Sequence, residues 1–525
     1  MAERSPENST TSVGPPVDGG RILLGSLGEP SNLIPPLASD SASHELAAHL
    51  YVAPLRYDKD IRIVPWAAEW YTVEDGGLTL SFKLREGIRW FDGRELTADD
   101  VEFTYRLMID PKTPTAYAED YKRIESFETT GRYTFVVRYK EVFARSLVTW
   151  AHSILPRHVL EGEDLLQTTY SRNPVGAGAF RLEAWDPGRR IVLRANEDYF
   201  LGRPHLDQVI YRIIPDSATM FLELKAGGLD MMNLSPQQYL FQTGGDSWDS
   251  EFRKFEYLSF SYVYLGYNLD LPLFSSAKVR RALTMAIDTE EIVKGVLLGL
   301  GEPTVGPYKP GTWVYNRDIV PWGFDPEAAL ALLAEEGWTD SDGDGVLDRD
   351  GLPFFFTILT NQGNDMRIKT ATIIQHRLKK IGIKVEIRTV EWATFIKEFV
   401  DKRRFDAVLL GWNILQDPDL FDVWHSSKAE PGGLNFVGYK DEELDALLER
   451  GRSTLDTADR KVMYDRIQEI LHRDQPYTFL YVPMSLPILQ ARFQGVKPAP
   501  AGITYNFDRW WVPSEAQRVR PIAQP

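Results

Sequence analysis

The sequence predicts an α/β protein, and three stretches carry that prediction. Residues 354–390 read as a strand, an amphipathic helix and a second strand, an order typical of a parallel βαβ unit. Residues 406–412, DAVLLGW, form an apolar run with the length of a buried strand. Residues 78–84 alternate apolar and polar side chains at period two, as a half-buried strand does.

Length and composition narrow the class of protein. A chain of 525 residues holds roughly two to four domains, and 43% hydrophobic residues are enough for large cores. The net charge of −16 disfavours nucleic acids and anionic membranes as partners, because both attract clustered Lys and Arg. With no cysteine, the chain has no disulfide, thiolate metal site or cysteine nucleophile.

The first part of the chain changes character near residue 20. Residues 1–20 are rich in Ser, Thr, Pro and Gly, and we predict a disordered tether there. Residues 21–28 read as the first core strand, and residues 40–55 as a loop followed by a helix capped by Ser43. No apolar run is long enough to span a membrane, and on that ground alone the chain reads as cytoplasmic.

Residues 69–108 contain the most ordered set of signals. A strand, turns at Gly87 and Gly93, and a helix start follow one another, with Thr97 and Asp100 spaced as in a capping box. Residues 131–139 alternate again, so residues 56–160 are predicted to form one α+β subdomain. Farther on, residues 441–474 read as helical and residues 478–482 as a strand.

The order of these residues resembles the signature of the family 5 extracytoplasmic solute-binding proteins. That family includes the dipeptide- and oligopeptide-binding proteins of ABC importers. The resemblance extends over nearly the whole chain, from about residue 21 to residue 513. The matching positions are Leu84, Arg85, Gly87, Trp90, Asp92, Gly93 and Leu96–Val101; Asn173–Gly176, Gly178, Trp185, Gly188, Asn196, Tyr199, Pro204, Leu206 and Asp207; and Asn268, Phe274, Val279, Arg280, Ala282, Leu283 and Ala286–Asp288.

The resemblance implies a two-lobe periplasmic-binding-protein type II fold, with an extra α+β subdomain inserted in the first lobe and ligand held between the lobes. The chain then crosses between lobes near Leu265–Asn268 and Tyr481–Leu486. The implied boundaries are 21–44, 173–265 and 486–515 for lobe I, 45–172 for the inserted subdomain, and 266–485 for lobe II.

The resemblance also implies a function. A monomeric binding protein outside the cytoplasm would take up a peptide or a similar small solute and deliver it to an ABC permease, which is driven by a separate ATPase. A signal peptide and a lipid-carrying cysteine would then precede residue 1. A periplasmic sensory or chaperone-like binding protein is one alternative. A hydrolase is another, although the chain contains no GxSxG, HExxH or SxxK motif in a suitable context.

Two tryptophans are the best candidates for the walls of the cleft. By the resemblance, Trp392 and Trp412 occupy positions that line the ligand pocket, and simple core packing is the alternative. The loop that contains Ser41 and Ser43 and the segment from Tyr264 to Asn268 are weaker candidates.

The loop after Trp412 departs from the family pattern. Peptide binders carry an aspartate three residues after this tryptophan, four before a proline, which pairs with the ligand's α-ammonium. Here the two alignments give Leu415 or Ile414, so the ligand need not be a free peptide. Asn413 lies in the same loop, and Asp417 or Asp419 could replace the missing anion only if the loop is rebuilt.

A separate acidic motif spans residues 340–351. Asp340, Asp342 and Asp344 precede a glycine, as in the first half of an EF-hand calcium loop, and Asp348 takes position nine. Position twelve is Gly351 instead of the bidentate Glu. The motif predicts either a weak structural calcium site or a turn stabilised by Asp side chains; the chain is expected to need no other cofactor.

Overall fold

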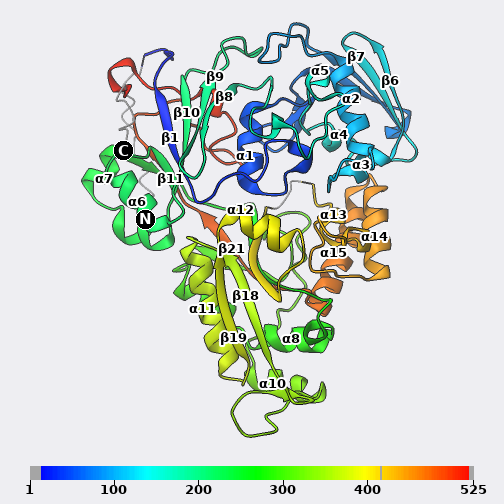
Figure 1. Ribbon diagram of the computed structural model, residues 1–525, viewed down its shortest axis with the longest axis vertical. Coiled ribbons are helices and arrows are strands. Elements are labelled where there is room, and N and C mark those ends of the chain that lie inside the picture. The colour runs from blue at the N-terminus through cyan, green and yellow to red at the C-terminus, as the bar shows by residue number, and fades with distance from the viewer. Residues whose placement is uncertain (1–13, 414–416, 519–525) are drawn as a thin grey trace, which may run out of the picture.

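The computed structural model describes residues 14–413 and 417–518. The chain folds into two lobes, each built on one mixed sheet, with lobe I above lobe II in Figure 1. The type II fold predicted for the chain is confirmed. The lobe I sheet runs in the spatial order β12 (Phe252–Lys254), β22 (Pro487–Gln490), β11 (Met231–Asn233), β1 (Arg21–Ser26), β10 (Gln208–Ile213), β9 (Arg190–Ala195) and β8 (Phe180–Asp186).

The lobe II sheet contains the predicted βαβ unit. Strands β18 and β19 pair in parallel through seven residues and are joined by α11, and β20 also lies parallel to β18. The spatial order is β13 (Tyr257–Leu258), β21 (Tyr477–Ser485), β14 (Ser261–Tyr267), β20 (Ala407–Asn413), β18 (Phe355–Asn361) and β19 (Lys384–Val390), with β15 (Gly301–Pro303) on β21.

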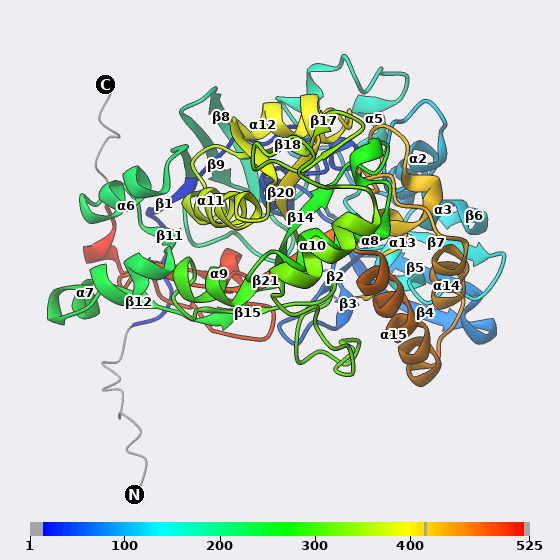
Figure 2. The same ribbon diagram turned by 90° about the horizontal axis from the view of Figure 1, so that it is seen from below.

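Helices cover both faces of the lobe II sheet and bury two separate apolar cores. The helical segment predicted over 441–474 is divided into two helices at Ser453. Figure 2 looks along the long axis from the lobe II end, with α8 and α10 toward the viewer. The helices are α8 (Ala277–Met285), α9 (Thr289–Gly295), α10 (Pro326–Glu335), α11 (Asp365–Lys379), α13 (Phe421–Trp424), α14 (Glu442–Arg452) and α15 (Thr457–Asp474).

The inserted subdomain is an antiparallel sheet with helices against it, and it shares one continuous core with lobe I. The predicted capping box is present, since the Thr97 and Asp100 side chains each accept a hydrogen bond from the other residue's backbone. The sheet order is β4 (Ala68–Glu74), β5 (Thr79–Leu84), β7 (Thr134–Tyr139) and β6 (Ile124–Gly131), and the helices are α2 (Ala98–Ile109), α3 (Ala118–Lys122), α4 (Ser146–Thr149) and α5 (Arg157–Leu160).

The first passage between the lobes lies earlier than the predicted Leu265–Asn268. The chain leaves the lobe I sheet after β12, and all of β14 pairs between β20 and β21 in lobe II. Side chains of β14 alternate between the two lobe II cores, which fixes the strand there. The second passage lies between β21 and β22, and β13 pairs with the last two residues of β21, so both passages are joined by strand pairing.

The start of the chain also differs from the prediction. The first helix, α1 (Ser41–Leu50), is capped by Asp40 instead of Ser43, and the Asp40 carboxylate accepts a hydrogen bond from the Ser43 backbone. Most of the predicted tether, residues 1–13, lies outside the described residues. Its last residues are held on lobe I, where Gly19 donates a backbone hydrogen bond to the His205 carbonyl and Asp18 contacts the His205 ring.

Candidate functional site

The lobes face each other at the carboxyl ends of β18, β19 and β20. Ligands of open α/β sheets bind at this edge. Two close contacts show that the lobes touch there: a Cβ on Gly28 of lobe I would lie 2.6 Å from Trp392 Cβ, and one on Gly363 of lobe II would lie 1.8 Å from the Pro215 carbonyl oxygen. The structure therefore has the lobes in contact around the site.

Asp40 is the polar centre of the lobe I side. Its buried carboxylate accepts hydrogen bonds from the hydroxyls of Ser31 (2.5 Å) and Ser43 (2.6 Å), and the Trp392 indole N–H reaches it from lobe II at 3.4 Å. Ser43 is fully buried and engaged with Asp40, so it supports the loop, whereas Ser41 is exposed at the start of α1.

One face of α1 forms the lobe I wall. Ser41, His44, Glu45 and Ala48 recur at helical spacing and stay exposed. The surrounding protein nevertheless raises the pKa of the Glu45 carboxyl by desolvation, in spite of a 3.2 Å hydrogen bond from the Tyr211 hydroxyl. Glu45 is therefore partly enclosed by the surrounding protein, with the lobe I residue Tyr211 beside it.

Both predicted tryptophans lie at the carboxyl ends of lobe II strands, on the side that faces lobe I. Trp392 forms the start of α12 (Trp392–Thr394), directly after β19, and is half-buried. Trp412 is also half-buried: it stacks on Phe436 with ring centroids 5.7 Å apart and donates its indole N–H to the Tyr477 hydroxyl at 3.2 Å. Asn413 is exposed beside it at the end of β20.

Two other predicted residues do not lie in the wall. Tyr264 is fully buried and stacks on Tyr477 at 3.9 Å. Asn268 lies at the far end of β14, because Ser261 pairs with Asn413 at the cleft end and Tyr267 pairs with Ala407 at the other. Its amide donates to the Phe405 carbonyl at 2.9 Å, so Asn268 fixes a turn of lobe II.

Arg367 is a cleft residue that the sequence did not reveal. It lies in the first turn of α11 and donates to the Asn361 amide oxygen at 2.7 Å. A Cβ on Gly411 would lie 3.0 Å from its Nη2 atom and 2.9 Å from the Tyr262 carbonyl oxygen, so a side chain there would crowd both this guanidinium and the neighbouring strand β14. No carboxylate lies within ion-pair distance of Arg367 among the described residues, and burial lowers its pKa. No motif marks such an arginine in a single sequence.

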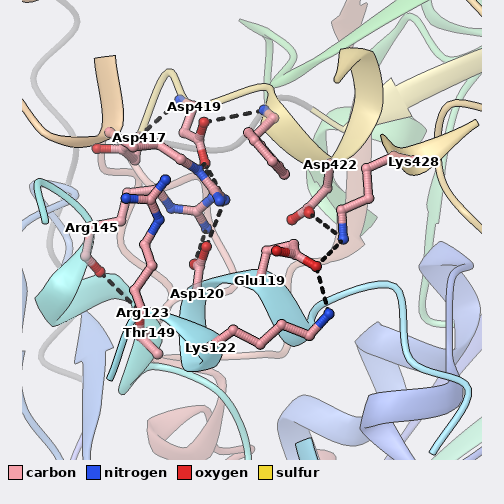
Figure 3. A network of polar contacts seen from close by, with 12 residues as sticks. Glu119, Asp120, Lys122, Arg123, Arg145, Thr149, Asp417, Asp419, Asp422 and Lys428 are labelled. Carbon is pink, nitrogen blue, oxygen red and sulfur yellow. Dashed lines mark hydrogen bonds and ion pairs between the residues drawn. The ribbon is translucent and has the colours of Figure 1, made fainter. Parts of the chain in front are cut away.

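Asp417 and Asp419 are engaged with arginines. Arg145 contacts Asp419 at 2.5 Å and Asp120 at 3.4 Å (Figure 3), and Arg452 reaches the same two carboxylates at 2.8 and 2.6 Å. Asp120 and Arg145 belong to the inserted subdomain, whereas Asp419 and Arg452 belong to lobe II. This buried cluster of four charged residues therefore joins the inserted subdomain to lobe II.

Asp417 contacts Arg460 at 3.1 Å. Neither aspartate is therefore a free anion for a ligand ammonium, and the predicted substitution of Asp417 or Asp419 for the missing carboxylate has no support in this arrangement. Ile414 and Leu415, on which the predicted departure from peptide binders depends, lie outside the described residues.

Asp401 is a carboxylate near the lobe junction without an ion-pair partner among the described residues. Asp401 has no ion pair or side-chain hydrogen bond among the residues described, and burial together with the charge of Asp40 raises its pKa to about 6. Asp40 belongs to lobe I and Asp401 to lobe II, so acidic groups from both lobes meet at this place.

The acidic loop at 340–351 lies at the surface, away from the cleft. Carboxylate oxygens of Asp340, Asp342 and Asp348 come within 4.8 Å of one another, whereas Asp344 is outside this triad and accepts from the Val346 N–H. Asp340 accepts from two backbone N–H groups, and Asp348 accepts from both the N–H and the hydroxyl of Ser341. Such bonds are those of a turn stabilised by Asp side chains, and the triad also has the oxygen chemistry that calcium prefers.

Because its carboxylates are already satisfied by the loop, we expect the melting temperature to be the same with calcium and with a chelator. A ligand at a hundred times its Kd would stabilise the folded state by about 2.7 kcal/mol. Differential scanning fluorimetry checks this. A rise with calcium that Asp342→Asn removes would contradict the turn interpretation and establish a metal site.

Two lobes, a double passage between them and lobe contacts at the carboxyl ends of the lobe II strands are the features of a two-lobed solute-binding protein. Residues 62–432 match the model of the bacterial extracellular solute-binding proteins, family 5 middle. The chain belongs to this family, whose members act outside the cytoplasm as binding proteins and not as enzymes. In the described ranges, no helix is both long and apolar enough to cross a bilayer.

Among curated relatives, the oligopeptide-binding protein AppA of Bacillus subtilis is 36% identical over 97% of this chain and 95% of its own length. Its structure in complex with a nonapeptide superposes with a TM-score of 0.91, covering 95% of this chain and 100% of that one. DppA from Helicobacter pylori in complex with the peptide STSA is 26% identical, with a TM-score of 0.84, over 94% of this chain and 98% of its own.

Proposed function

We propose that this protein binds a peptide, or a solute of similar size, between its lobes and delivers it to the permease of an ABC importer. The contact of the two lobes at the carboxyl ends of β18, β19 and β20, where Trp392 of lobe II reaches Asp40 of lobe I, is the observation that carries this proposal. We place the ligand there, between α1 on one side and Trp392, Trp412 and Arg367 on the other. The similarity to an oligopeptide-binding protein over nearly its whole length supports it. The binding protein acts as a monomer, and a separate ATPase drives the permease.

The wall chemistry fits a peptide-like ligand. Half-buried indole rings offer apolar surface, the Asn413 side chain offers both a donor and an acceptor, and Arg367 offers a charged donor for a carboxylate. A lipid anchor upstream, which the resemblance implies, remains a prediction. Mass spectrometry of solutes that co-purify with the protein tests the proposal directly: peptides of defined length support it, and a solute without amide bonds contradicts the peptide assignment.

A free peptide N-terminus is not expected to be required. Asp417 and Asp419 are paired with arginines, and a buried ammonium without an anion would cost several kcal/mol. We expect a binding peptide and its N-acetylated form to have affinities within about threefold, or about 0.6 kcal/mol, in isothermal titration calorimetry.

A loss of tenfold or more on acetylation would overturn that expectation. Asp401 would then be the first carboxylate to test, because it lacks a cation among the described residues. Asp401→Asn would abolish the difference between the two peptides if this residue held the ammonium. Glu398→Gln, an exposed carboxylate one turn earlier in the same helical segment, is the matched control.

A further inference from the structure

A second recess lies in lobe I, between α1 and the inserted subdomain. Its cavity of about 240 Å³ is distinct from the wall formed by the tryptophans of lobe II. Its lining is contributed by the loop before α1, by α1 itself, by α2 and α3, and by the segment between α4 and α5: Pro35, Pro36, His44, Ala47, Ala48, Tyr51, Ala53, Trp66, Thr104, Met108, Tyr117, Tyr121, Ala151, His152 and Ser153. We call it the α1 recess.

The α1 recess opens toward the cleft. His44 and Ala48 line it and belong to the exposed face of α1 that forms the lobe I wall. Tyr117 lines the opposite side of the recess. Burial raises the pKa of its phenol, and the nearby negative charges of Asp422, Asp40 and Asp401 raise it further. Asp422 and Asp401 belong to lobe II, so the Tyr117 side of the recess lies near lobe II.

The lining carries no formal charge at neutral pH. It contains no Asp, Glu, Lys or Arg in a chain whose net charge is −16. Its two histidines are neutral, since burial lowers the pKa of His44 and brings that of His152 to about 4. A charged group entering this recess would lose its hydration and would contact no side chain of opposite charge in the lining, since the carboxylates of Asp40, Asp401 and Asp422 lie outside it.

Most polar groups of the lining are already engaged. The hydroxyl of Tyr117 donates to the Ala38 carbonyl at 2.9 Å, that of Tyr121 to the Thr149 carbonyl at 3.1 Å, and that of Tyr51 to the Leu33 carbonyl at 2.8 Å. The imidazole of His152 makes no hydrogen bond within the described part of the chain. Its ring lies 6.0 Å from the Tyr117 ring and 6.2 Å from the Tyr121 ring. The His152 imidazole is therefore an uncommitted hydrogen-bonding group next to aromatic side chains, and the neighbouring Ser153 hydroxyl also makes no hydrogen bond among the described residues.

The volume limits the occupant. Whole small-molecule ligands occupy pockets of roughly 300–1,000 Å³, whereas 240 Å³ holds about eight waters at liquid density. We propose that the α1 recess receives one uncharged aromatic side chain of the bound ligand, with His152 as the hydrogen-bond partner of a phenolic hydroxyl. This inference rests on the proposed function, because the occupant is part of the transported ligand.

The test uses p-cresol, the side chain of tyrosine as a free molecule, and two charged analogues, benzylamine and benzoate. Calorimetry and crystals soaked in each compound report binding. We expect p-cresol to bind the intact protein in the α1 recess and both charged analogues to bind at least tenfold more weakly. Ala48→Phe, which places a ring at the mouth, should abolish p-cresol binding, whereas Ala334→Phe on the exposed side of α10 should not.

His152→Phe separates the hydrogen bond from the packing. It keeps a ring in place, so toluene should bind as before, while p-cresol should lose its advantage over toluene. Absence of p-cresol from the recess, or equal binding by the Ala48→Phe variant, would overturn the proposal.

Alanine pentapeptides with a central Tyr or Gly then separate this proposal from the proposed function. If both peptides bind equally well and p-cresol does not bind, the proposed transport function stands and the proposal for the α1 recess is refuted. If p-cresol binds but none of the peptides does, the recess stands as a binding site for aromatic rings and the proposed peptide transport fails.

Discussion

Replacing Asp419 by alanine is expected to destabilise the protein by about 3–5 kcal/mol, the cost of leaving buried charges without their partner. The Asp419 carboxylate is almost completely buried and contacts both Arg145 and Arg452. Without it, the two guanidiniums would share Asp120 alone. The measurement is the urea midpoint of unfolding, followed by tryptophan fluorescence.

Glu398→Ala is the matched control, because its carboxylate pairs with Lys402 at the surface. Exposed pairs contribute about 0–1 kcal/mol, so its midpoint should move little. Asp419→Asn keeps the shape of the side chain and removes its charge. Its urea midpoint should lie between those of Asp419→Ala and Glu398→Ala. A midpoint for Asp419→Ala equal to that of the control would mean that the buried cluster contributes nothing net to stability.

The same carboxylate links stability to pH. Burial opposes ionisation of Asp419, but the charges of Arg452 and Arg145 outweigh it and hold its pKa well below the usual range. The group is charged in both states above an unfolded pKa of about 3.9, where its stabilising contribution is fully present. That contribution is lost as the pH falls below this value toward the folded pKa.

Removing the cleft tryptophans is expected to weaken ligand binding by at least tenfold, or about 1.4 kcal/mol, for each of Trp392→Ala and Trp412→Ala. Both rings are half-buried at the carboxyl ends of lobe II strands, where we propose that the ligand binds. Calorimetry with the ligand that co-purifies measures the change. Trp70→Ala, at an exposed position of β4 in the inserted subdomain, is the control and should leave affinity unchanged.

Trp392 has a second role that a milder variant can isolate. Its indole N–H contacts Asp40 across the lobes, and Trp392→Phe removes this contact while keeping an aromatic wall. We expect Trp392→Phe to lose less affinity than Trp392→Ala. If Trp412→Ala lowers the melting temperature without a separable loss of binding, its ring is core packing over Phe436 and not a ligand wall.

Local signals in the sequence were sufficient for individual elements. The capping box of Thr97 and Asp100 and the parallel pair β18 and β19 depend on residues close in the chain, and both are present as predicted. The family resemblance supplied the lobe architecture and the two tryptophans. The passage placed at Leu265–Asn268 from the same resemblance was too late in the chain, because β14 is apolar on both faces and its position depends on pairing with β20 and β21.

The charged contacts of the site could not be predicted in the same way. Arg145 and Asp419 are 274 residues apart in sequence and come together only through the docking of the inserted subdomain on lobe II. Arg367 reads in the sequence as an ordinary residue at the start of an amphipathic helix. Its position is fixed by Asn361, which accepts its hydrogen bond, and by the lack of a side chain at Gly411 beside it. The exposed face of α1 could not be predicted to lie near lobe II either, because that position depends on how the lobes pack.

The strand pairing between β13 and the end of β21 has a mechanical consequence. Two independent linkers would let one lobe swivel, slide or tilt on the other. Here the outgoing and returning chains are hydrogen-bonded side by side, with Tyr257 opposite Ser485 and Leu258 opposite Met484. Because the hydrogen bonds between the two strands resist shear, we expect the lobes to separate by a hinge motion at this ribbon, without sliding past each other. Under the proposed function, the permease would then distinguish the liganded protein from the empty one by the angle between the lobes.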